Sequence, residues 1–282
     1  MFNLLKSIFR YLKIFLLLFS FQNCNTPSLL NKYFYSQPEY FTNSIGMKLS
    51  MIPASDFDMG CSDLDTNCEL DEKPSTHQQL NSNFYIGVYE VTNGEYSKFT
   101  QETKYKTEAE ILKSPDTYEH CHFIPYNENS PVICITWNDA KAFTNWLSVK
   151  ENAEYRLPTE IEWEYSARGR NRSRYYWGDS FDESYVWFKK NSMDHPHPVG
   201  EKPPNAYGLH DILGNVWEWC ENDYIEKIPK NWNPKSSTSG EKSLRGGSWF
   251  DTELQLRVSS REFAPPNTRE NHYGFRVIRT NK

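Results

Sequence analysis

The sequence predicts a single α+β domain with little regular secondary structure. Aromatic side chains make up 16 % of the 282 residues, and 13 Gly and 16 Pro indicate many turns between short elements. Rings of Tyr and Trp can fill a core, provided that their O–H and N–H groups find partners. This composition differs from that of a disordered chain. No repeat and no compositional break divides the body, which we place at residues 42–280.

Three helix starts share one signature, a threonine followed three residues later by a carboxylate. They are Thr92 with Glu95, Thr136 with Asp139, and Thr159 with Glu162. In such a capping box the hydroxyl accepts a hydrogen bond from a backbone N–H of the first turn, and the carboxylate accepts one from the N–H of the threonine. We therefore interpret the three acids as capping residues rather than catalytic ones. The third helix is expected to end at Gly169.

Short runs rich in β-branched and aromatic residues predict the strands. The expected strands are 49–53, 57–60, 84–91, 132–135, 244–249, 256–260 and 273–279. Between residues 170 and 245 no period is visible. We expect long connections there, which are usually functional or pinned by ions.

The first 23 residues have the pattern of a secretory signal peptide. A basic start precedes the apolar run 14–21, which is shorter than the roughly twenty residues that a membrane-spanning helix needs. Cys24 follows at the expected cleavage point, as in the lipobox of bacterial lipoproteins, although residues 21–23 are bulkier than usual. We expect a signal peptide at 1–23, a lipid on Cys24 and a tether over 24–41, with ordinary cleavage or an uncleaved anchor as the alternative. The protein would then be exported, at the membrane surface or in the periplasm of the bacterial cell envelope.

The net charge limits the kinds of partner that the protein can bind, and the cysteine count limits the possible disulfides. A formal net charge of −6 provides no basic surface for nucleic acid, so no nucleic-acid partner is expected. Export implies an oxidising compartment, in which cysteines pair. Without Cys24, five of the six cysteines remain, so at least one stays unpaired within the chain. Cys61–Cys68 is the first candidate disulfide and Cys121–Cys134 the second, with free thiols as the alternative.

Eight ordered motifs carry a family resemblance. They are FDMG (57–60), YEVTNGEY (89–96), PVICITWNDAKAFTNWL (131–147), YRLPTEIEWEYSARG (155–169), YYWGD (175–179), PPNAYGLHDILGNVWEWCENDY (203–224), LRGGSW (244–249) and YGFRVIR (273–279). In this order they resemble the formylglycine-generating enzyme (sulfatase-modifying factor) family. The resemblance implies that family's α+β fold, which is related to C-type lectins, together with bound calcium.

The resemblance also implies an oxidase that converts a sulfatase cysteine to formylglycine with oxygen and copper. In such enzymes two cysteines, five residues apart, follow a Gly-Gly-Ser-aromatic motif, which here is 246–249. Asp251 and Leu256 occupy the two cysteine positions, whereas copper(I) is held by thiolates. We therefore expect neither copper nor formylglycine synthesis. Trp217 and Ser248 match residues that line the family's pocket, and a purely structural role is the alternative for both.

For calcium the resemblance implies a defined ligand set. The side chain of Asp211, the backbone carbonyls of Gly214 and Val216, and the carboxylate of Glu218 would hold the ion. Calcium prefers six to eight oxygens from carboxylates and carbonyls, so we expect one structural calcium ion here. Surface or hydrogen-bonded acids are the alternative. The family's other calcium site would begin at Tyr185, which is a poor ligand, so we assign no ion there.

Other metals have weaker support in the sequence. His195 and His197 stand in a DHPHP run that suggests a transition metal, but no third ligand is nearby, and exposed loop histidines are the alternative. Iron stays open because relatives of the family in thiol-histidine sulfoxide synthesis use non-haem iron. Their iron histidines lie largely in an extra helical domain.

Two functions follow from these expectations. The first is a binding or assembly module of the cell envelope, lipid-anchored to the membrane, with a protein, peptide or glycan as its partner. The second is an atypical metal-dependent oxidase or maturation enzyme of the same family. We favour the first, because the family's cysteine pair is missing while its scaffold is kept.

Overall fold

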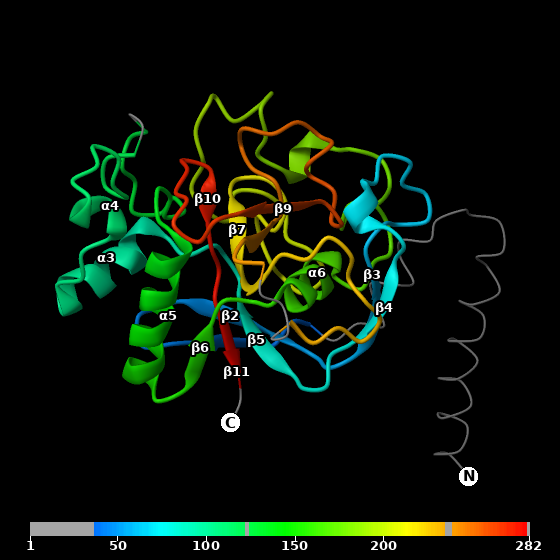
Figure 1. Cartoon of the computed structure of the whole chain (residues 1–282), viewed down its shortest axis with the longest axis horizontal. Coiled ribbons are helices and arrows are strands. Elements are labelled where there is room, and N and C mark those ends of the chain that lie inside the picture. Colours follow the sequence, from blue (N-terminus) through cyan, green and yellow to red (C-terminus); the bar gives the residue numbers. More distant parts are fainter. Residues whose placement is uncertain (1–36, 122–123, 235–238, 281–282) are drawn as a thin grey trace, which may run out of the picture. The chain divides into compact units, whose positions relative to one another are not determined.

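Two sheets and a two-stranded ribbon form the framework of the computed structural model, which describes residues 37–121, 124–234 and 239–280 (Figure 1). The first sheet is antiparallel, and its order is β1-β2-β5-β11-β6. Its strands are β1 (Tyr40–Thr42), β2 (Lys48–Ile52), β5 (Phe84–Gly87), β11 (Ile278–Thr280) and β6 (Glu154–Arg156). The ribbon pairs β3 (Asp56–Met59) with β4 (Thr76–Gln79). Strands far apart in sequence therefore become neighbours.

The second sheet has the order β10-β7-β8-β9 and carries the predicted pocket residues. Its strands are β10 (Tyr273–Gly274), β7 (Trp217–Asp223), β8 (Lys242–Arg245) and β9 (Arg261–Ala264). β10 runs parallel to β7, and the other pairs are antiparallel. Because side chains alternate along a strand, Trp217 and Trp219 share one face of β7, whereas Glu218 and Cys220 share the other.

The predicted helix starts are confirmed. The helices are α3 (Asn93–Thr103), α4 (Glu108–Ile111), α5 (Trp137–Glu151) and α6 (Glu160–Arg168), with 3₁₀ turns η1 (Leu70–Glu72) and η2 (Glu183–Tyr185). Complete capping boxes open α3, α5 and α6 as expected. A fourth box at Thr107 opens α4 and was not predicted. Gly169 ends α6 in a left-handed conformation. In Figure 1, α3, α4 and α5 gather on the side of the domain opposite to β3 and β4.

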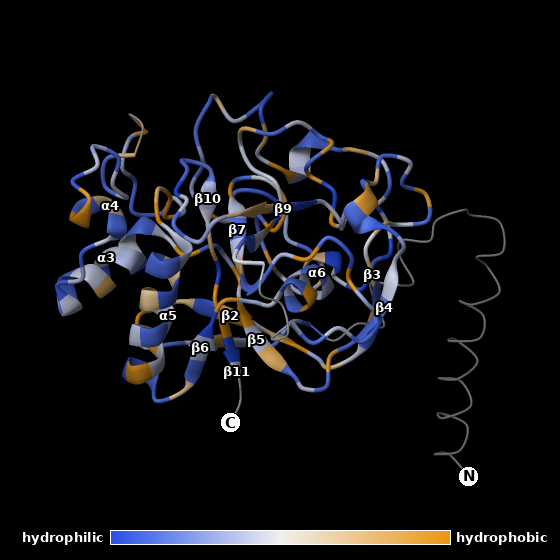
Figure 2. Cartoon of the chain, in the orientation of Figure 1, coloured by the Kyte–Doolittle hydropathy of each residue, from blue (hydrophilic) through white to orange (hydrophobic). Residues whose placement is uncertain are grey.

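Aromatic and aliphatic side chains form two large buried clusters. One joins α3 and α5 to both sheets through residues such as Phe99, Phe143 and Trp219. The other packs Trp163 of α6 against residues of the long connections, among them Tyr175. Hydrophobic residues concentrate in this interior, and hydrophilic residues dominate the outer loops (Figure 2). The connections from 170 to 216 are thus held mainly by buried rings.

Two expected strands are absent from the structure. Residues 132–135 are buried, as a strand would be, but Cys134 has a φ of 56°. Val132 and Cys134 donate to carbonyls of different segments, Val91 and Glu270, so no ladder forms. Residues 256–260 are also buried without a strand, and the paired strand begins only at Arg261. β7 was missed because most of its side chains are buried on both faces, which removes the alternation that a prediction needs.

Both candidate disulfides are present in the structure. Cys61 is joined to Cys68 and Cys121 to Cys134. Among the described cysteines, Cys220 stays a free thiol and is buried.

The predicted signal peptide and Cys24 lie outside the described residues. Strand β1 includes Tyr40 and Phe41, which the sequence had assigned to the tether. Within the described ranges, no helix combines the length and the apolar character that crossing a membrane requires.

Candidate functional site

The predicted pocket residues are brought together around one carboxylate. Oδ2 of Asp251 accepts a hydrogen bond of 2.8 Å from Nε1 of Trp217 and one of 2.5 Å from Oγ of Ser248. β7 supplies Trp217, and the turn after β8 supplies the other two, since the N–H of Asp251 donates to the carbonyl of Ser248. Burial raises the pKa of Asp251, and the hydrogen bonds from Ser248 and Trp217 act against that rise.

Leu256, at the second cysteine position, belongs to the core. Its side chain has no exposed surface and packs in the cluster around Trp163. Gly247 permits this packing: its φ is 73°, and a Cβ atom there would lie 2.7 Å from Cδ2 of Leu256. A larger residue at this position would push Leu256 away.

These residues do not fit copper(I). Asp251 is an oxygen ligand that already holds two donors, and Leu256 has no ligand atom. Cys220, the free thiol of the described residues, lies on the other face of β7 from Trp217. Neither position therefore offers copper(I) a thiolate.

Further side chains surround this carboxylate and were not predicted. Tyr273 of β10 pairs with Trp217 across the sheet, and the imidazole of His272 stacks on Phe250, which is 52 % exposed. Burial raises the pKa of Glu262, and the charge of Asp251 raises it further. Glu262 lies opposite Leu244 and shares its sheet face. The alternation of side chains along a strand at 261–264 is the sequence signal that could have placed Glu262 on this face.

A buried ion pair occupies the second predicted site. The guanidinium of Arg276 donates to both carboxylate oxygens of Glu218, at 2.6 and 2.7 Å. Nε1 of Trp163 donates to Oε2 of Glu218 at 2.7 Å. Glu218 is therefore fully engaged by protein groups.

Asp211 and Glu90 behave differently from Glu218. Asp211 is 2 % exposed and accepts from the N–H of Gly200 through Oδ2, while its Oδ1 has no hydrogen-bond partner among the described residues. Glu90 is 1 % exposed; its Oε1 accepts from Asn215, and its Oε2 likewise has no partner there. Burial raises the pKa of Asp211 to about 7. Burial and the charge of Asp211 raise the pKa of Glu90. Two bare carboxylate oxygens inside a protein favour a cation or a proton.

This donor set fits calcium in part. Of the two charged ligands that the resemblance implied, Asp211 keeps a bare oxygen and Glu218 does not. Gly214 and Val216 lie in the turn between them, with Gly214 at a φ of 78° and Val216 buried. Glu90 is the unpredicted member of the group. In the sequence Glu90 stood out only as a single acid among the apolar and aromatic residues of 88–91.

The remaining metal candidates do not converge on one ion. His195 and His197 stack with ring centroids 4.8 Å apart, whereas a metal lies in the plane of an imidazole ring, so the two cannot share it. His197 is buried against Trp187, so the expectation of an exposed loop is wrong for this residue. Asp65, Cys68 and Glu72 also lie close together. Cys68 is in a disulfide, however, and both acids bind Arg257.

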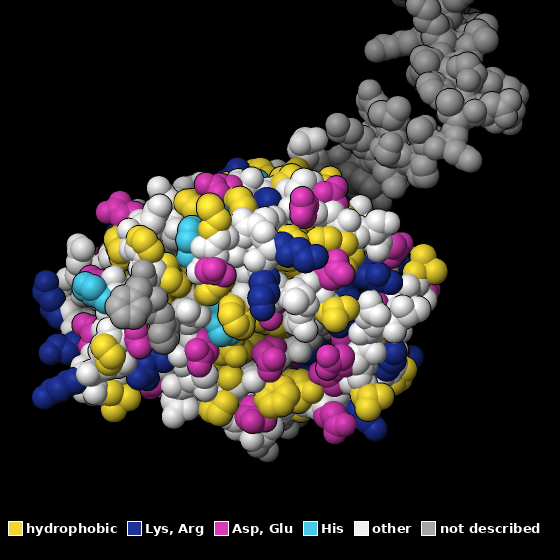
Figure 3. Space-filling model, turned by 90° about the horizontal axis from the view of Figure 1, so that it is seen from above, with side chains coloured by type: hydrophobic (Ala, Val, Ile, Leu, Met, Phe, Trp, Pro, Cys, Tyr) yellow, Lys and Arg dark blue, Asp and Glu magenta, His cyan; other side chains and the backbone are white. Residues whose placement is uncertain are grey.

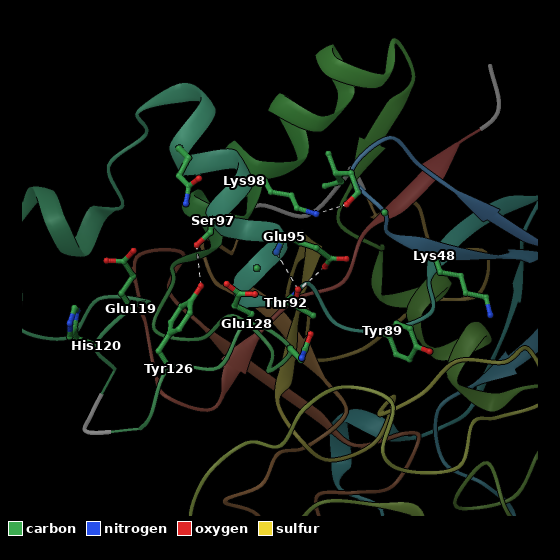
Figure 4. Close-up of a pocket in the computed structure, with 15 residues that line it drawn as sticks. Lys48, Tyr89, Thr92, Glu95, Ser97, Lys98, Glu119, His120, Tyr126 and Glu128 are labelled. Carbon is green, nitrogen blue, oxygen red and sulfur yellow. Dashed lines mark hydrogen bonds between the residues drawn. The ribbon is translucent and has the colours of Figure 1, made fainter.

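A further cavity lies away from all predicted site residues. It measures about 810 Å³ and lies beside the first turns of α3, with Lys48 and Tyr89 at one end and His120 at the other (Figure 4). Several of its polar groups are already bonded: Nζ of Lys98 donates to the carbonyl of Ile45, and Glu95 caps α3. The cavity therefore adds no ligand set to the two sites above.

Comparison with known proteins identifies the family. Residues 37–281 match the model of the sulfatase-modifying factor enzyme 1-like domain. The chain is 30 % identical over 283 residues to the formylglycine-generating enzyme of Mus musculus, covering 81 % of this chain and 74 % of that protein. It is 30 % identical over 243 residues to the inactive C-alpha-formylglycine-generating enzyme 2 of Mus musculus, covering 68 % and 74 %. The structure of PvdO from Pseudomonas aeruginosa matches with a TM-score of 0.78 at 27 % identity, over 88 % of this chain and 100 % of that one, which confirms the α+β fold. This chain therefore belongs to the sulfatase-modifying factor family.

Proposed function

We propose that this chain makes no formylglycine and acts as a binding or assembly module of the bacterial cell envelope. The observation that carries the proposal is the bonding of Asp251, whose Oδ2 accepts from both Trp217 and Ser248. Asp251 is a carboxylate, so it has no thiolate with which to bind copper, and its oxygen is already engaged by the two pocket residues. The pocket is thereby closed by its own hydrogen bonds.

Two further observations support a role without catalysis. Leu256 is enclosed by the core, so no small rotation brings a ligand atom to the second cysteine position. Relatives from Mus musculus and Bos taurus, 30 % and 28 % identical, carry the name inactive C-alpha-formylglycine-generating enzyme 2. The family scaffold therefore also occurs in proteins named for lacking the activity.

The surface around the pocket supports a partner. Phe250, Leu254 and Phe263 are 40 to 52 % exposed, and apolar side chains lie among carboxylates on the face seen in Figure 3. Large contiguous apolar patches with a polar rim mark interaction sites, and these three side chains would belong to such a patch. A protein, peptide or glycan could bind here.

Export and the anchor are part of the same proposal. A signal peptide at 1–23 and a lipid on Cys24 would hold the domain at the membrane surface. The mass of the mature protein from bacterial membranes should include the lipid. The variant Cys24→Ser should lose both this mass and the membrane fraction, whereas an unmodified mature N-terminus in the natural chain would contradict the anchor.

The central test is a reaction with a sulfatase-type peptide. The purified mature protein, supplied with copper(I) and air, should leave the mass of a peptide with the sulfatase cysteine motif unchanged. The double variant Asp251→Cys with Leu256→Cys is the matched comparison, and it should retain copper(I) that the natural chain releases. Conversion of the peptide to the aldehyde by the natural chain would overturn the proposal.

One observation favours the second candidate function, an atypical metal-dependent oxidase or maturation enzyme. The pKa values of Asp251 and Glu262 are both raised, chiefly by burial, and carboxyl groups with raised pKa values serve as general acids or bases in many enzymes. Metal analysis separates the two functions. Stoichiometric iron or copper, with oxygen uptake, would support the enzyme, whereas calcium alone would support the module.

A further inference from the structure

A buried ion cluster ties the segment after Leu256 to the loop closed by the Cys61–Cys68 disulfide. The two terminal nitrogens of Arg257 donate to the two oxygens of Glu72, at 2.6 and 2.7 Å. One of these nitrogens also donates to Asp65 at 3.1 Å, and Oγ of Ser259 donates to Glu72 at 2.6 Å. Arg257, Asp65 and Glu72 are all buried. The two segments are thus joined by charges that water does not reach.

The disulfide fixes the two carboxylates of this cluster. Asp65 lies inside the ring that Cys61 and Cys68 close. Its N–H donates to the carbonyl of Ser62, and its Oδ1 accepts from the N–H of Asn67. The N–H of Cys61 donates to the carbonyl of Glu72 at 2.9 Å, which links the second acid to the same ring. A disulfide restricts the conformations open to the residues inside its ring, here those that include Asp65.

Arg257 in turn positions the segment 251–260, which includes Asp251. Its Nε donates to the carbonyl of Leu254 at 2.7 Å. The N–H of Gln255 donates to the carbonyl of Thr252, which continues the connection toward Asp251. No strand holds this segment between Asp251 and Ser260. Backbone bonds to Arg174 and Lys189 and the buried side chain of Leu256 hold it in part. Arg257 adds charged contacts to the loop 61–72.

We propose that Cys61–Cys68 is a redox-sensitive lock on the segment 251–260, with Arg257 as the positioning residue that transmits it. Both cysteines are partly exposed, so a reductant can reach them. A dithiol supplies two electrons and two protons: the S–S bond breaks, two thiols form, and the dithiol itself becomes a disulfide. The loop 61–68 then moves freely, and Asp65 and Glu72 no longer hold Arg257 in one place. A buried guanidinium without fixed partners is strongly destabilised, so the segment loosens.

Hydrogen exchange read by mass spectrometry tests the lock without any assay of function, so its outcome is separate from that of the proposed function. In the double variant Cys61→Ser with Cys68→Ser, amides of 251–260 should exchange at least about tenfold faster. Amides of β5 and β11 should keep their natural rates. The matched control is Cys121→Ser with Cys134→Ser, which should leave 251–260 unchanged.

Two further arms keep the test decisive if the first variant folds poorly. Dithiothreitol added to the Cys121→Ser, Cys134→Ser protein opens only Cys61–Cys68, and it should accelerate exchange in 251–260. In Arg257→Gln the amides of 251–260 should already exchange fast before reduction, and reduction should increase their exchange rates little. Unchanged protection of 251–260 after reduction would overturn the lock, as would an equal acceleration throughout the domain. A full redox response in Arg257→Gln would overturn the role of Arg257.

Discussion

Two segments contain the positions that the family resemblance assigns to metals, and the carboxylates of the two segments are bonded differently. At 248–251 a single oxygen of Asp251 accepts hydrogen bonds from both Trp217 and Ser248. At 211–218 the ion pair of Glu218 is complete, but Asp211 keeps a bare oxygen in the interior. Buried polar atoms without partners are rare because they are costly. The first segment is held by hydrogen bonds, whereas in the second a carboxylate oxygen of Asp211 has no partner among the described residues.

The largest effect is expected from the ion pair of the second segment. The variant Arg276→Met leaves Glu218 charged and buried with Trp163 as its remaining side-chain donor. Breaking such a pair should lower the free energy of unfolding by about 3–5 kcal/mol, measured by urea denaturation. The control Lys150→Met removes an ion pair on exposed surface and should change little. If the two variants lowered the free energy of unfolding equally, the buried ion pair would be no more important than the exposed one.

The pH dependence of the calcium-free protein is expected to be nearly as large. Burial raises the pKa of Asp211 from 3.8 to about 7, so between these values the folded chain holds a proton that the unfolded chain has lost. Stability should therefore fall as the pH rises through this window, by on the order of 3 kcal/mol. Thermal unfolding in a chelator at pH 5 and pH 8 measures the fall, and Asp211→Asn should reduce it. Equal stability at the two pH values would refute the bare carboxylate.

Calcium should reverse this loss. An ion that binds only the folded chain stabilises it by about 2.7 kcal/mol when its concentration is a hundred times Kd. Glu90→Gln should weaken the calcium effect, because it removes a charge beside Asp211. Asp251→Asn, in the other segment, should leave it intact. A melting temperature that does not respond to calcium would argue that a proton occupies the site.

The smallest effect is expected in the closed segment. Asp251→Ala leaves the indole N–H of Trp217 and the hydroxyl of Ser248 without their acceptor, which should lower the free energy of unfolding by about 1–2 kcal/mol. Asp251→Asn keeps an acceptor oxygen and should stay close to the natural chain. If the two variants unfold alike in urea, the hydrogen bonds of Asp251 are not what holds the pocket closed.

Local signals were read correctly from the sequence. The helix starts at Thr92, Thr136 and Thr159 depend on residues three positions apart, so a short window contains the whole interaction. The assignment of Asp251 and Leu256 to the cysteine positions also depends on a neighbouring motif, and it stays a prediction. Such features need no knowledge of the rest of the chain.

Interactions between distant segments were not readable in the same way. Residues 132–135 look like a strand, yet their backbone bonds to two different segments. Glu90 lies 121 positions before Asp211 in the sequence, and only the fold brings the two acids together. The partner that engages Glu218 is Arg276, from the end of the described chain. Contacts between segments far apart in the sequence determine these features, and no local sequence pattern indicates them.

The place of β11 has a consequence for how the chain folds as it is made. β11 is the last described strand in sequence order, yet it lies between β5 and β6. Synthesis proceeds from the N-terminus, so β5 and β6 emerge well before the strand that joins them. Until then both carry open edges that can pair with other chains. Helices α3, α5 and α6, each with its own capping box, can form meanwhile. The first sheet can be completed only when residues 278–280 have been synthesised and β11 pairs with both strands.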